Sequence, residues 1–408
     1  MRRFKEFENA DAWEQCRLGD VAHFRRGSFP QPYGNKDWYD GLDAMPFVQV
    51  VDVGFDLKLV GATKQKISKL AQPMSVFVPK DTVVVTLQGS IGRVAITQYD
   101  AYVDRTLLIF EDYEKPINPI FWAFVIQQKF DVEKQRAPGG TIKTITKEAL
   151  SDFKITMPNI DEQVAIGNFF STLDTTITFH QRKLEKVKAL KTAYLAEMFP
   201  AEGERKPKRR FAGFTDAWEQ CRLGDVTSKI GSGKTPKGGE STYANQGIPL
   251  IRSQNIYDAI VDLRGVAFIS AETDSEMQNS RVNPDDILLN ITGASIGRSA
   301  VYMEDFPANV NQHVCIVRPT SEYSPTFIQQ NIASSTGQNQ IDSFQAGGAR
   351  EGLNFQQIAK ISFSFPSFEE QTKIGTFFST LDHTITFHQR RLEKLQNIKK
   401  AYLNEMFV

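Results

Sequence analysis

Residues 166–186 read IGNFFSTLDTTITFHQRKLEK, and residues 374–394 read IGTFFSTLDHTITFHQRRLEK, with 18 of the 21 positions identical. A second identity opens each half of the chain, because DAWEQCRLGDV at residues 11–21 recurs unchanged at residues 216–226. The copies are offset by 208 and 205 residues, so the 408-residue chain is an internal duplication. Between these constant ends the halves differ, which predicts two different recognition surfaces at equivalent positions. Random drift would erode the constant ends and the inserts together.

The closing repeat of each half has the apolar spacing of a long coiled-coil helix. Apolar or semi-apolar residues recur at intervals of four and three over residues 166–198 and 374–406. Asn159 and Ser367 are each followed three positions later by glutamate, as in a capping box at a helix start. A helix of about 37 residues would be roughly 55 Å long, equal to about 16 base pairs of duplex. We expect the two helices to pair antiparallel, with a pseudo-twofold axis relating the halves.

The residues predicted to pack between the two helices lie on one seam. They are Ile166, Phe170, Leu173, Ile177 and Leu184 in the first copy, and Ile374, Phe378, Leu381, Ile385 and Leu392 in the second. His180 and His388 lie on the same seam, where a polar residue more often fixes register than takes part in catalysis.

Overall composition is that of an ordinary globular protein, with 41% hydrophobic and 24% charged residues. Lys plus Arg equals Asp plus Glu at 48 each, so DNA binding by bulk attraction is not expected. Local basic patches remain possible, because exposed charges more than about 10 Å apart are largely screened. No apolar stretch of membrane-spanning or signal-peptide type is present, so we expect a cytoplasmic protein without membrane contact. Cys16, Cys221 and Cys315 lack metal-ligand spacing, and no metal site is expected.

The two inserts, residues 22–157 and 227–365, have the mixed pattern of α/β domains, which places the chain in the α+β class. Strands are expected at residues 82–87 and 286–292, and short helices at 121–135 and 325–341. A shared Ser-Ile-Gly-Arg turn follows each of these strands, at residues 90–93 and 295–298. Its glycine permits close backbone approach to a phosphate, and its arginine suits phosphate or guanine. A plain hairpin turn with a solvated arginine explains the same residues.

Residues 311–313, Asn-Gln-His, stand opposite residues 104–106, Asp-Arg-Thr, and carry side chains able to pair with adenine or guanine edges. Basic and amide-bearing loops provide further candidates. The complete set of candidate DNA-contacting residues is Arg25, Arg26, Gln88, Ser90, Arg93, Arg105, Thr141, Lys143, Lys234, Thr235, Thr292, Ser295, Arg298, Asn311, Gln312 and Arg350.

Motifs of catalysis are missing from the sequence. Gly233-Lys234-Thr235 resembles the end of a phosphate-binding P-loop, but that motif requires glycine at position 228, which is serine, and a helix where Pro236 stands. The Asn/Asp-Pro-Pro-aromatic tetrapeptide of amino-methyltransferases does not occur, and the only Pro-Asp, at 284–285, lacks the acidic-x-Lys of a nuclease site. We therefore expect no catalytic residues, although a nucleotide hydrolase is the rival interpretation within the enzyme class.

These features together resemble the specificity (S) subunits of type I restriction-modification enzymes, over essentially the whole chain. The resemblance rests on Trp-Glu-Gln-x-x-Leu-Gly-Asp at 13–20 and 218–225, on the Ser-Ile-Gly turn, and on Glu-Gln-x-x-Ile-Gly-x-Phe-Phe at 162–170 and 370–378. It implies target-recognition domains at residues 1–157 and 214–365, with opening segments at 7–21 and 216–226. It also implies helical regions at 158–200 and 366–408 and a basic linker at 201–213.

The resemblance further implies that each domain reads one half of a bipartite, asymmetric double-stranded DNA site while the helices set the spacer. Two methyltransferase subunits would dock on the chain and bring S-adenosylmethionine to methylate adenine, and two restriction/translocase subunits would bring Mg-ATP. No cofactor would bind the chain itself. The halves differ at Asp104-Arg105 and Asn311-Gln312, so DNA contacts should not be copied between them. A coiled-coil adaptor without sequence readout, or the specificity chain of a fused, type IIB-like system, remain the alternatives.

Overall fold

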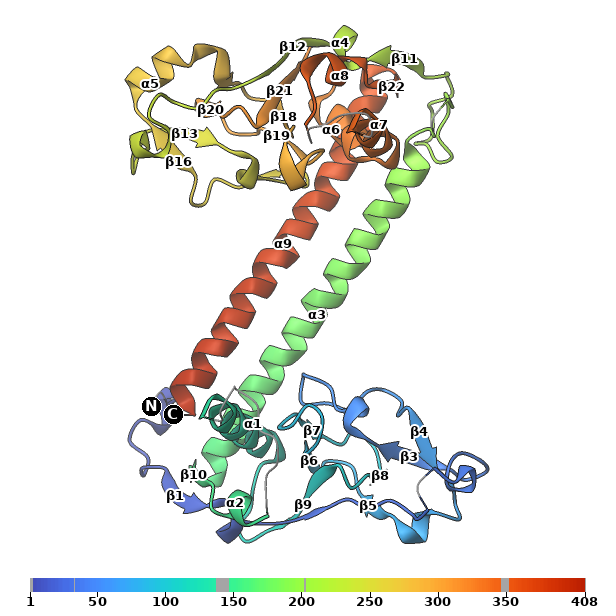
Figure 1. Cartoon of the computed structure of the whole chain (residues 1–408), viewed down its shortest axis with the longest axis vertical. Helices are drawn as coiled ribbons and strands as arrows, with labels where there is room; N and C mark the ends of the chain where they lie inside the picture. The colour runs from blue at the N-terminus through green and yellow to red at the C-terminus, as the bar shows by residue number, and fades with distance from the viewer. Residues whose placement is uncertain (1–2, 33, 137–146, 202, 346–351, 408) are drawn as a thin grey trace. The chain divides into compact units, whose positions relative to one another are not determined.

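The computed structural model describes residues 3–32, 34–136, 147–201, 203–345 and 352–407. The chain forms two compact units: unit 1 consists of Met1–His180 with Arg391–Val408, and unit 2 consists of Gln181–Arg390. The longest helices are α3 (Ile160–Met198) and α9 (Phe368–Met406). Each of them is divided between the two units. The helices and strands of both units are labelled in Figure 1.

Unit 1 contains two four-stranded sheets and one two-stranded sheet. Its strands are β1 (Glu14–Arg17), β2 (Ala22–Arg26), β3 (Met45–Val48), β4 (Gln65–Ile67), β5 (Val76–Val78), β6 (Val83–Thr86), β7 (Val94–Ile96), β8 (Ala101–Val103), β9 (Leu107–Tyr113) and β10 (Lys154–Met157). Its other helices are α1 (Pro119–Arg136) and α2 (Lys147–Ser151). The strand orders are β2-β9-β6-β7, β4-β3-β8-β5 and β1-β10, with β3 and β8 parallel and all other pairs antiparallel.

Unit 2 repeats this topology with one added hairpin, β14-β15. Its strands are β11 (Glu219–Arg222), β12 (Thr227–Ser232), β13 (Ile248–Ile251), β14 (Ile256–Tyr257), β15 (Ile260–Val261), β16 (Ala267–Ile269), β17 (Arg281–Val282), β18 (Ile287–Asn290), β19 (Ser299–Val301), β20 (Ala308–Val310), β21 (Val314–Pro319) and β22 (Ser362–Phe365). Its shorter helices are α4 (Leu223–Val226), α5 (Ala271–Glu276), α6 (Pro325–Ala333), α7 (Ser335–Gln345) and α8 (Phe355–Lys360). The orders β12-β21-β18-β19 and β16-β13-β20-β17, with β13 parallel to β20, match unit 1 strand for strand. The α+β class and the duplication are confirmed.

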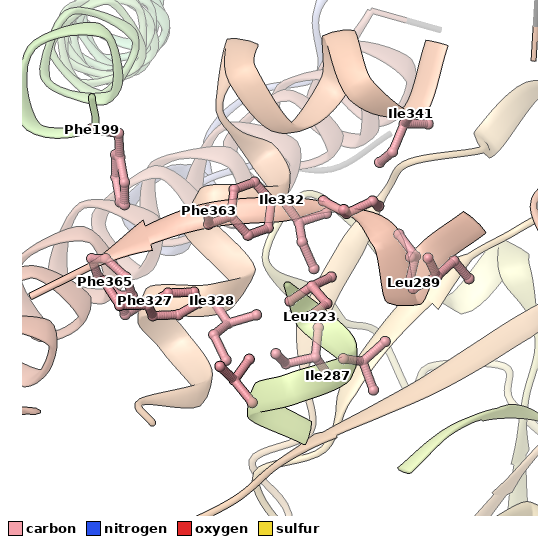
Figure 2. Close-up of a cluster of buried hydrophobic side chains, with 14 of the residues drawn as sticks. Phe199, Leu223, Ile287, Leu289, Phe327, Ile328, Ile332, Ile341, Phe363 and Phe365 are labelled. Carbon is pink, nitrogen blue, oxygen red and sulfur yellow. The ribbon is translucent and has the colours of Figure 1, made fainter. Parts of the chain in front are cut away.

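The largest core of unit 2 joins its helices to the sheet β12-β21-β18-β19 (Figure 2). Ile287 and Leu289 of β18 and Phe327 of α6 are fully buried there, and Phe363 and Phe365 of β22 are nearly so. The alternation of buried residues along β22 is that of a strand with one face on a core. The repeated opening segment is held to the helix start by the antiparallel pair β11-β22 in unit 2, and by β1-β10 in unit 1.

Helices α3 and α9 lie antiparallel, as predicted. In unit 1, Lys399 Nζ lies 2.6 Å from Asp174 Oδ1, and in unit 2, Lys191 Nζ lies 2.5 Å from Asp382 Oδ1. From Asp174 to Lys191 is 17 residues forward along α3, whereas from Lys399 to Asp382 is 17 residues backward along α9. Both helices are 39 residues long, slightly more than the predicted 37.

The predicted seam residues differ in how far they are buried. Ile166, Phe170, Leu173, Ile177, Ile374, Phe378 and Leu392 are buried, whereas Leu184, Leu381 and Ile385 are half-buried. The ring of Phe170 lies 4.7 Å from that of Phe124 in α1 and 6.0 Å from that of Phe407. This part of the seam therefore packs against α1 as well as against the end of the chain, which heptad spacing alone does not indicate.

The Glu-Gln pair at the start of each long helix is structural. Gln163 and Gln371 are buried, and their amides donate to Pro158 O (3.0 Å) and Pro366 O (2.9 Å). The carboxylate of Glu162, fully buried, accepts from Arg3 Nε at 2.8 Å and from Trp13 Nε1 at 3.2 Å. In unit 1 these contacts tie the opening segment to the helix.

Two details of the sequence prediction need correction. The helix expected over residues 325–341 is two helices, α6 and α7, because Ser334 between them is extended at φ −67° and ψ 163°. The Ser-x-x-Glu capping box at α9 is half formed, since Glu370 N donates to Ser367 Oγ at 3.4 Å while the Glu370 carboxylate pairs with Arg210.

Among the helices of the described residues, none is long and apolar enough to cross a membrane.

Candidate nucleic-acid interface

Three loops of unit 1 meet beside the sheet β2-β9-β6-β7. They are residues 27–29 after β2, residues 87–93 between β6 and β7, and residues 104–106 between β8 and β9. Leu87 N donates to Thr106 O at 2.8 Å, which joins the second and third loops. Gly27 N donates to Leu107 O at 3.1 Å, which holds the first loop beside the third. Side chains from distant parts of the sequence are thereby gathered at one place.

The same three loops meet in unit 2, as residues 233–235, 291–298 and 311–313. Ile291 N donates to His313 O at 3.0 Å, the counterpart of the bond between Leu87 and Thr106. A glycine follows β2 in unit 1 and β12 in unit 2, because the chain there passes close to a neighbouring carbonyl. A Cβ at Gly27 would lie 2.3 Å from Val103 O, and one at Gly233 would lie 1.6 Å from Val310 O.

A buried polar side chain beneath each Ser-Ile-Gly-Arg turn holds its shape. In unit 1, Thr86 Oγ1 accepts from Arg93 N at 3.0 Å and donates to Ser90 O at 2.5 Å. In unit 2, Asn290 takes this place, and its Nδ2 donates to Ser295 Oγ at 3.1 Å. The turn is therefore a rigid support for the residues beside it.

Alanine at the turn glycines should be costlier in unit 1 than in unit 2. Both Gly92 and Gly297 have φ +84°, but a Cβ at Gly92 would lie 2.9 Å from Phe130 Cβ, whereas one at Gly297 would meet the flexible end of Gln338. We expect Gly92→Ala to destabilise unit 1 by about 2–4 kcal/mol and Gly297→Ala to destabilise unit 2 by about 1–2 kcal/mol. Amide hydrogen exchange of peptides from each unit, measured at increasing urea concentrations, gives the free energy of unfolding of that unit in the wild-type chain and in each variant. Equal costs at the two sites would contradict this reading of the turn.

The candidate DNA-contacting residues of unit 1 are mostly exposed. Arg25 Nε lies 3.6 Å from Glu111 Oε1, whereas Arg26, one residue further along β2, pairs with no carboxylate among the described residues. Gln88 is exposed at the turn, and Ser90 is half-buried. The guanidinium of Arg93 lies 4.0 Å from the ring centre of Phe55. That of Arg105 lies 5.6 Å from the ring centre of Phe29.

In unit 2 the candidates form a polar cluster. Lys234 Nζ donates to Glu276 O at 2.7 Å, and Thr292 Oγ1 lies 2.7 Å from His313 Nδ1. Thr235 Oγ1 donates to Gln312 Oε1, so these two candidates are in direct contact. Arg298 is exposed, with no carboxylate partner in the described part of the chain. The remaining candidates Thr141, Lys143 and Arg350 lie outside the described residues.

Asn311 points away from the surface on which it was expected. It is only 8% exposed, and its Oδ1 accepts from His313 N at 3.1 Å. Asp104 does the same in unit 1, where its Oδ1 accepts from Thr106 N at 2.9 Å. In both loops the first residue closes the turn by a hydrogen bond to its own backbone, and the second residue is exposed.

Sequence reasoning missed three residues at these loops, namely Phe29, Phe55 and His313 as a partner of Thr292. Phe55 is 80% exposed, which is unusual for a phenylalanine, and it lies in the turn Gly54-Phe55-Asp56. A large aromatic residue between glycine and aspartate was the available signal. The contacts of Phe29 and His313 depend on loops that meet only in the folded chain.

The cysteines carry no sign of chemistry. Cys315 is fully buried in β21, and burial raises the pKa of its thiol to about 12. Burial likewise raises the pKa of the Cys16 and Cys221 thiols. In the ranges that the structure describes, no group of His, Cys, Asp and Glu side chains could hold a metal ion.

The family model described as the type I restriction modification DNA specificity domain matches this chain twice, at residues 10–189 and 215–397. The type I restriction enzyme EcoBI specificity subunit of Escherichia coli is 22% identical over 421 residues, covering 97% of this chain and 86% of that protein. The MjaVIII specificity subunit of Methanocaldococcus jannaschii is 19% identical, covering 98% and 94%. Among solved structures, the type I restriction-modification S subunit from M. genitalium has the same fold, with a TM-score of 0.69 at 17% identity, covering 100% of this chain and 99% of that one.

Proposed function

This chain belongs to the specificity subunits of type I restriction-modification enzymes, the non-catalytic components that select the DNA target, and we propose that each unit reads one half of a split, asymmetric site. The reading surfaces in this proposal are the three loops of unit 1 and their counterparts in unit 2. The boundaries that we propose for the two target-recognition domains are residues 1–157 and 214–365, each followed in the sequence by a helical region, residues 158–200 and 366–408.

One observation supports the proposal above the others: equivalent loops in the two units carry different side chains on matching backbones. Arg105 and Gln312 occupy the same place in the loops between β8 and β9 and between β20 and β21. Phe29 and Thr235 lie beside them, each two residues after the glycine that follows β2 or β12. Two domains that recognise two different half-sites require equivalent backbones that present different exposed side chains to the bases.

The charge of the chain supports a role for partner subunits. Exposed cations with no carboxylate partner among the described residues, such as Arg26 and Arg298, can neutralise phosphates, but the chain has no net basic excess. We propose that two methyltransferase subunits with S-adenosylmethionine complete the DNA-binding complex, and that two restriction/translocase subunits with Mg-ATP join it. Helices α3 and α9 would set the unspecified spacer between half-sites. At 39 residues each is about 58 Å long, the length of about 17 base pairs.

Footprinting tests this function directly. The chain assembled with its methyltransferase partner should protect two short defined sequences separated by a spacer of any sequence. The chain alone should bind the same DNA at least tenfold more weakly at 0.15 M salt, because it lacks excess positive charge.

Two results would count against the proposal. Protection of no defined sequence by the complex would favour a coiled-coil adaptor. Equally tight binding by the isolated chain would remove the need for partner subunits in target selection.

A further inference from the structure

Residues 105 and 312 are equivalent positions at which the two units present different hydrogen-bonding groups. In each loop the preceding residue, Asp104 or Asn311, is turned inward to bond its own backbone. The next side chain, Arg105 or Gln312, is exposed. Because the backbone is alike in the two loops, any difference in what they read falls on this side chain and its immediate contacts.

Gln312 is held by two neighbours that use half of its hydrogen-bonding capacity. Its Oε1 accepts from Thr235 Oγ1, and its Nε2 lies 3.1 Å from His313 Nε2. An amide nitrogen only donates, so His313 Nε2 accepts and the ring proton is on Nδ1, 2.7 Å from Thr292 Oγ1. A glutamine amide has two donor hydrogens and two acceptor lone pairs. One donor and one acceptor of Gln312 therefore remain for a ligand.

That remaining pair matches one base edge. In the major groove adenine presents the N7 acceptor beside the N6 donor, which glutamine contacts through two parallel hydrogen bonds. Guanine presents two acceptors, N7 and O6, so an amide with one free donor can satisfy only one of them.

Arg105 differs from Gln312 in the hydrogen-bonding groups that it offers a base. Its guanidinium has donors only, and it pairs with no carboxylate among the described residues. The ring of Phe29, 5.6 Å away, offers an aromatic surface that restrains the planar group without using its N–H donors. Two parallel donors match the N7 and O6 acceptors of guanine.

We propose that Arg105 reads a guanine in one half-site and that Gln312 reads an adenine in the other, with Phe29, Thr235 and His313 as positioning residues. This inference rests on the proposed function of the two units as DNA readers. It assigns the base that each loop selects by the donors and acceptors that the folded loop leaves free.

Exchanging the two side chains tests the assignment. The complex of the chain with its methyltransferase partner is bound to a duplex library in which every base of the site is varied, at one fixed salt concentration. Gln312→Arg should change the preference from adenine to guanine at one position of one half-site, by about 5- to 150-fold. Arg105→Gln should change guanine to adenine at one position of the other half-site. Each variant is the control for the other, because its unaltered half-site must keep the wild-type preference.

Two further variants separate base reading from a loss of folding. Gln312→Glu keeps the side-chain volume but offers only acceptors, so the preference should move from adenine toward cytosine, whose N4 is a donor. His313→Phe should reduce discrimination at the same position without moving it, because Gln312 loses one of its two restraints. A general structural defect would weaken binding to every sequence alike.

The outcomes distinguish this inference from the function on which it rests. If the wild-type complex selects two half-sites but the exchanges leave every base preference unchanged, or weaken all sequences equally, the assignment is wrong and the function stands. If the wild-type complex selects no bipartite site, the proposed function itself fails.

Discussion

Replacing Glu370 by alanine is expected to lower the free energy of unfolding of unit 2 by about 3–5 kcal/mol. The Glu370 carboxylate is fully buried and accepts from Arg210 Nε at 2.6 Å and Arg210 Nη2 at 2.7 Å. These hydrogen bonds raise the pKa of Arg210, which stays charged when its partner is removed. The cost comes from that unpaired cation, whose side chain is only 15% exposed. For a domain of ordinary stability, about 5–15 kcal/mol, the loss is a large fraction of the total.

Glu369→Ala is the matched control, because the neighbouring residue in the same helical turn also pairs with a cation. Its partner Lys373 lies 2.9 Å away, but the side chains are 72% and 51% exposed, so the pair is worth at most about 1 kcal/mol. Urea-dependent hydrogen exchange of unit 2 peptides gives both values. Costs of similar size for the two variants would show that the buried Glu370–Arg210 pair stabilises unit 2 no more than an exposed ion pair does.

The two long helices and the internal duplication were predictable, because the residue spacing and the repeat that indicate them can be read directly from the sequence. The 3.5-residue apolar spacing and the polar caps were sufficient for both long helices, and the repeat predicted that unit 2 would copy unit 1. Asn159 caps α3, since Glu162 N donates to its Oδ1 at 2.9 Å, but the Glu162 carboxylate pairs with Arg3, so this capping box is half formed like the one at α9. The break at Ser334 was missed, although Ser334-Ser335-Thr336-Gly337 is a run of weak helix formers, and Ser334 Oγ accepts from Gly337 N at 3.3 Å at the start of α7.

The loops of the candidate interface were predictable in part. The shared Ser-Ile-Gly-Arg islands and the contrast between residues 104–106 and 311–313 indicated two of the three loops. The basic candidates Arg26 and Lys234 indicated the third. The inward turn of Asn311 and the contact between Thr235 and Gln312 were not predictable. Both depend on which backbone atoms lie nearby after strands far apart in sequence have paired. For the same reason Phe29 was overlooked, although it lies beside Arg105 in the folded chain.

Exchanging residues 22–157 for the corresponding insert of a relative with a different target tests the central claim, that each unit reads its own half-site. The constant opening segment and helix start, with Trp13 bonded to Glu162, lie outside the exchanged segment and should hold the new insert in place. The base preference of the complex is then measured across the whole site. We expect one half-site to be replaced and the other to keep its sequence, with discrimination against the old half-site of at least about 1000-fold. A change in both half-sites, or in neither, would contradict the account.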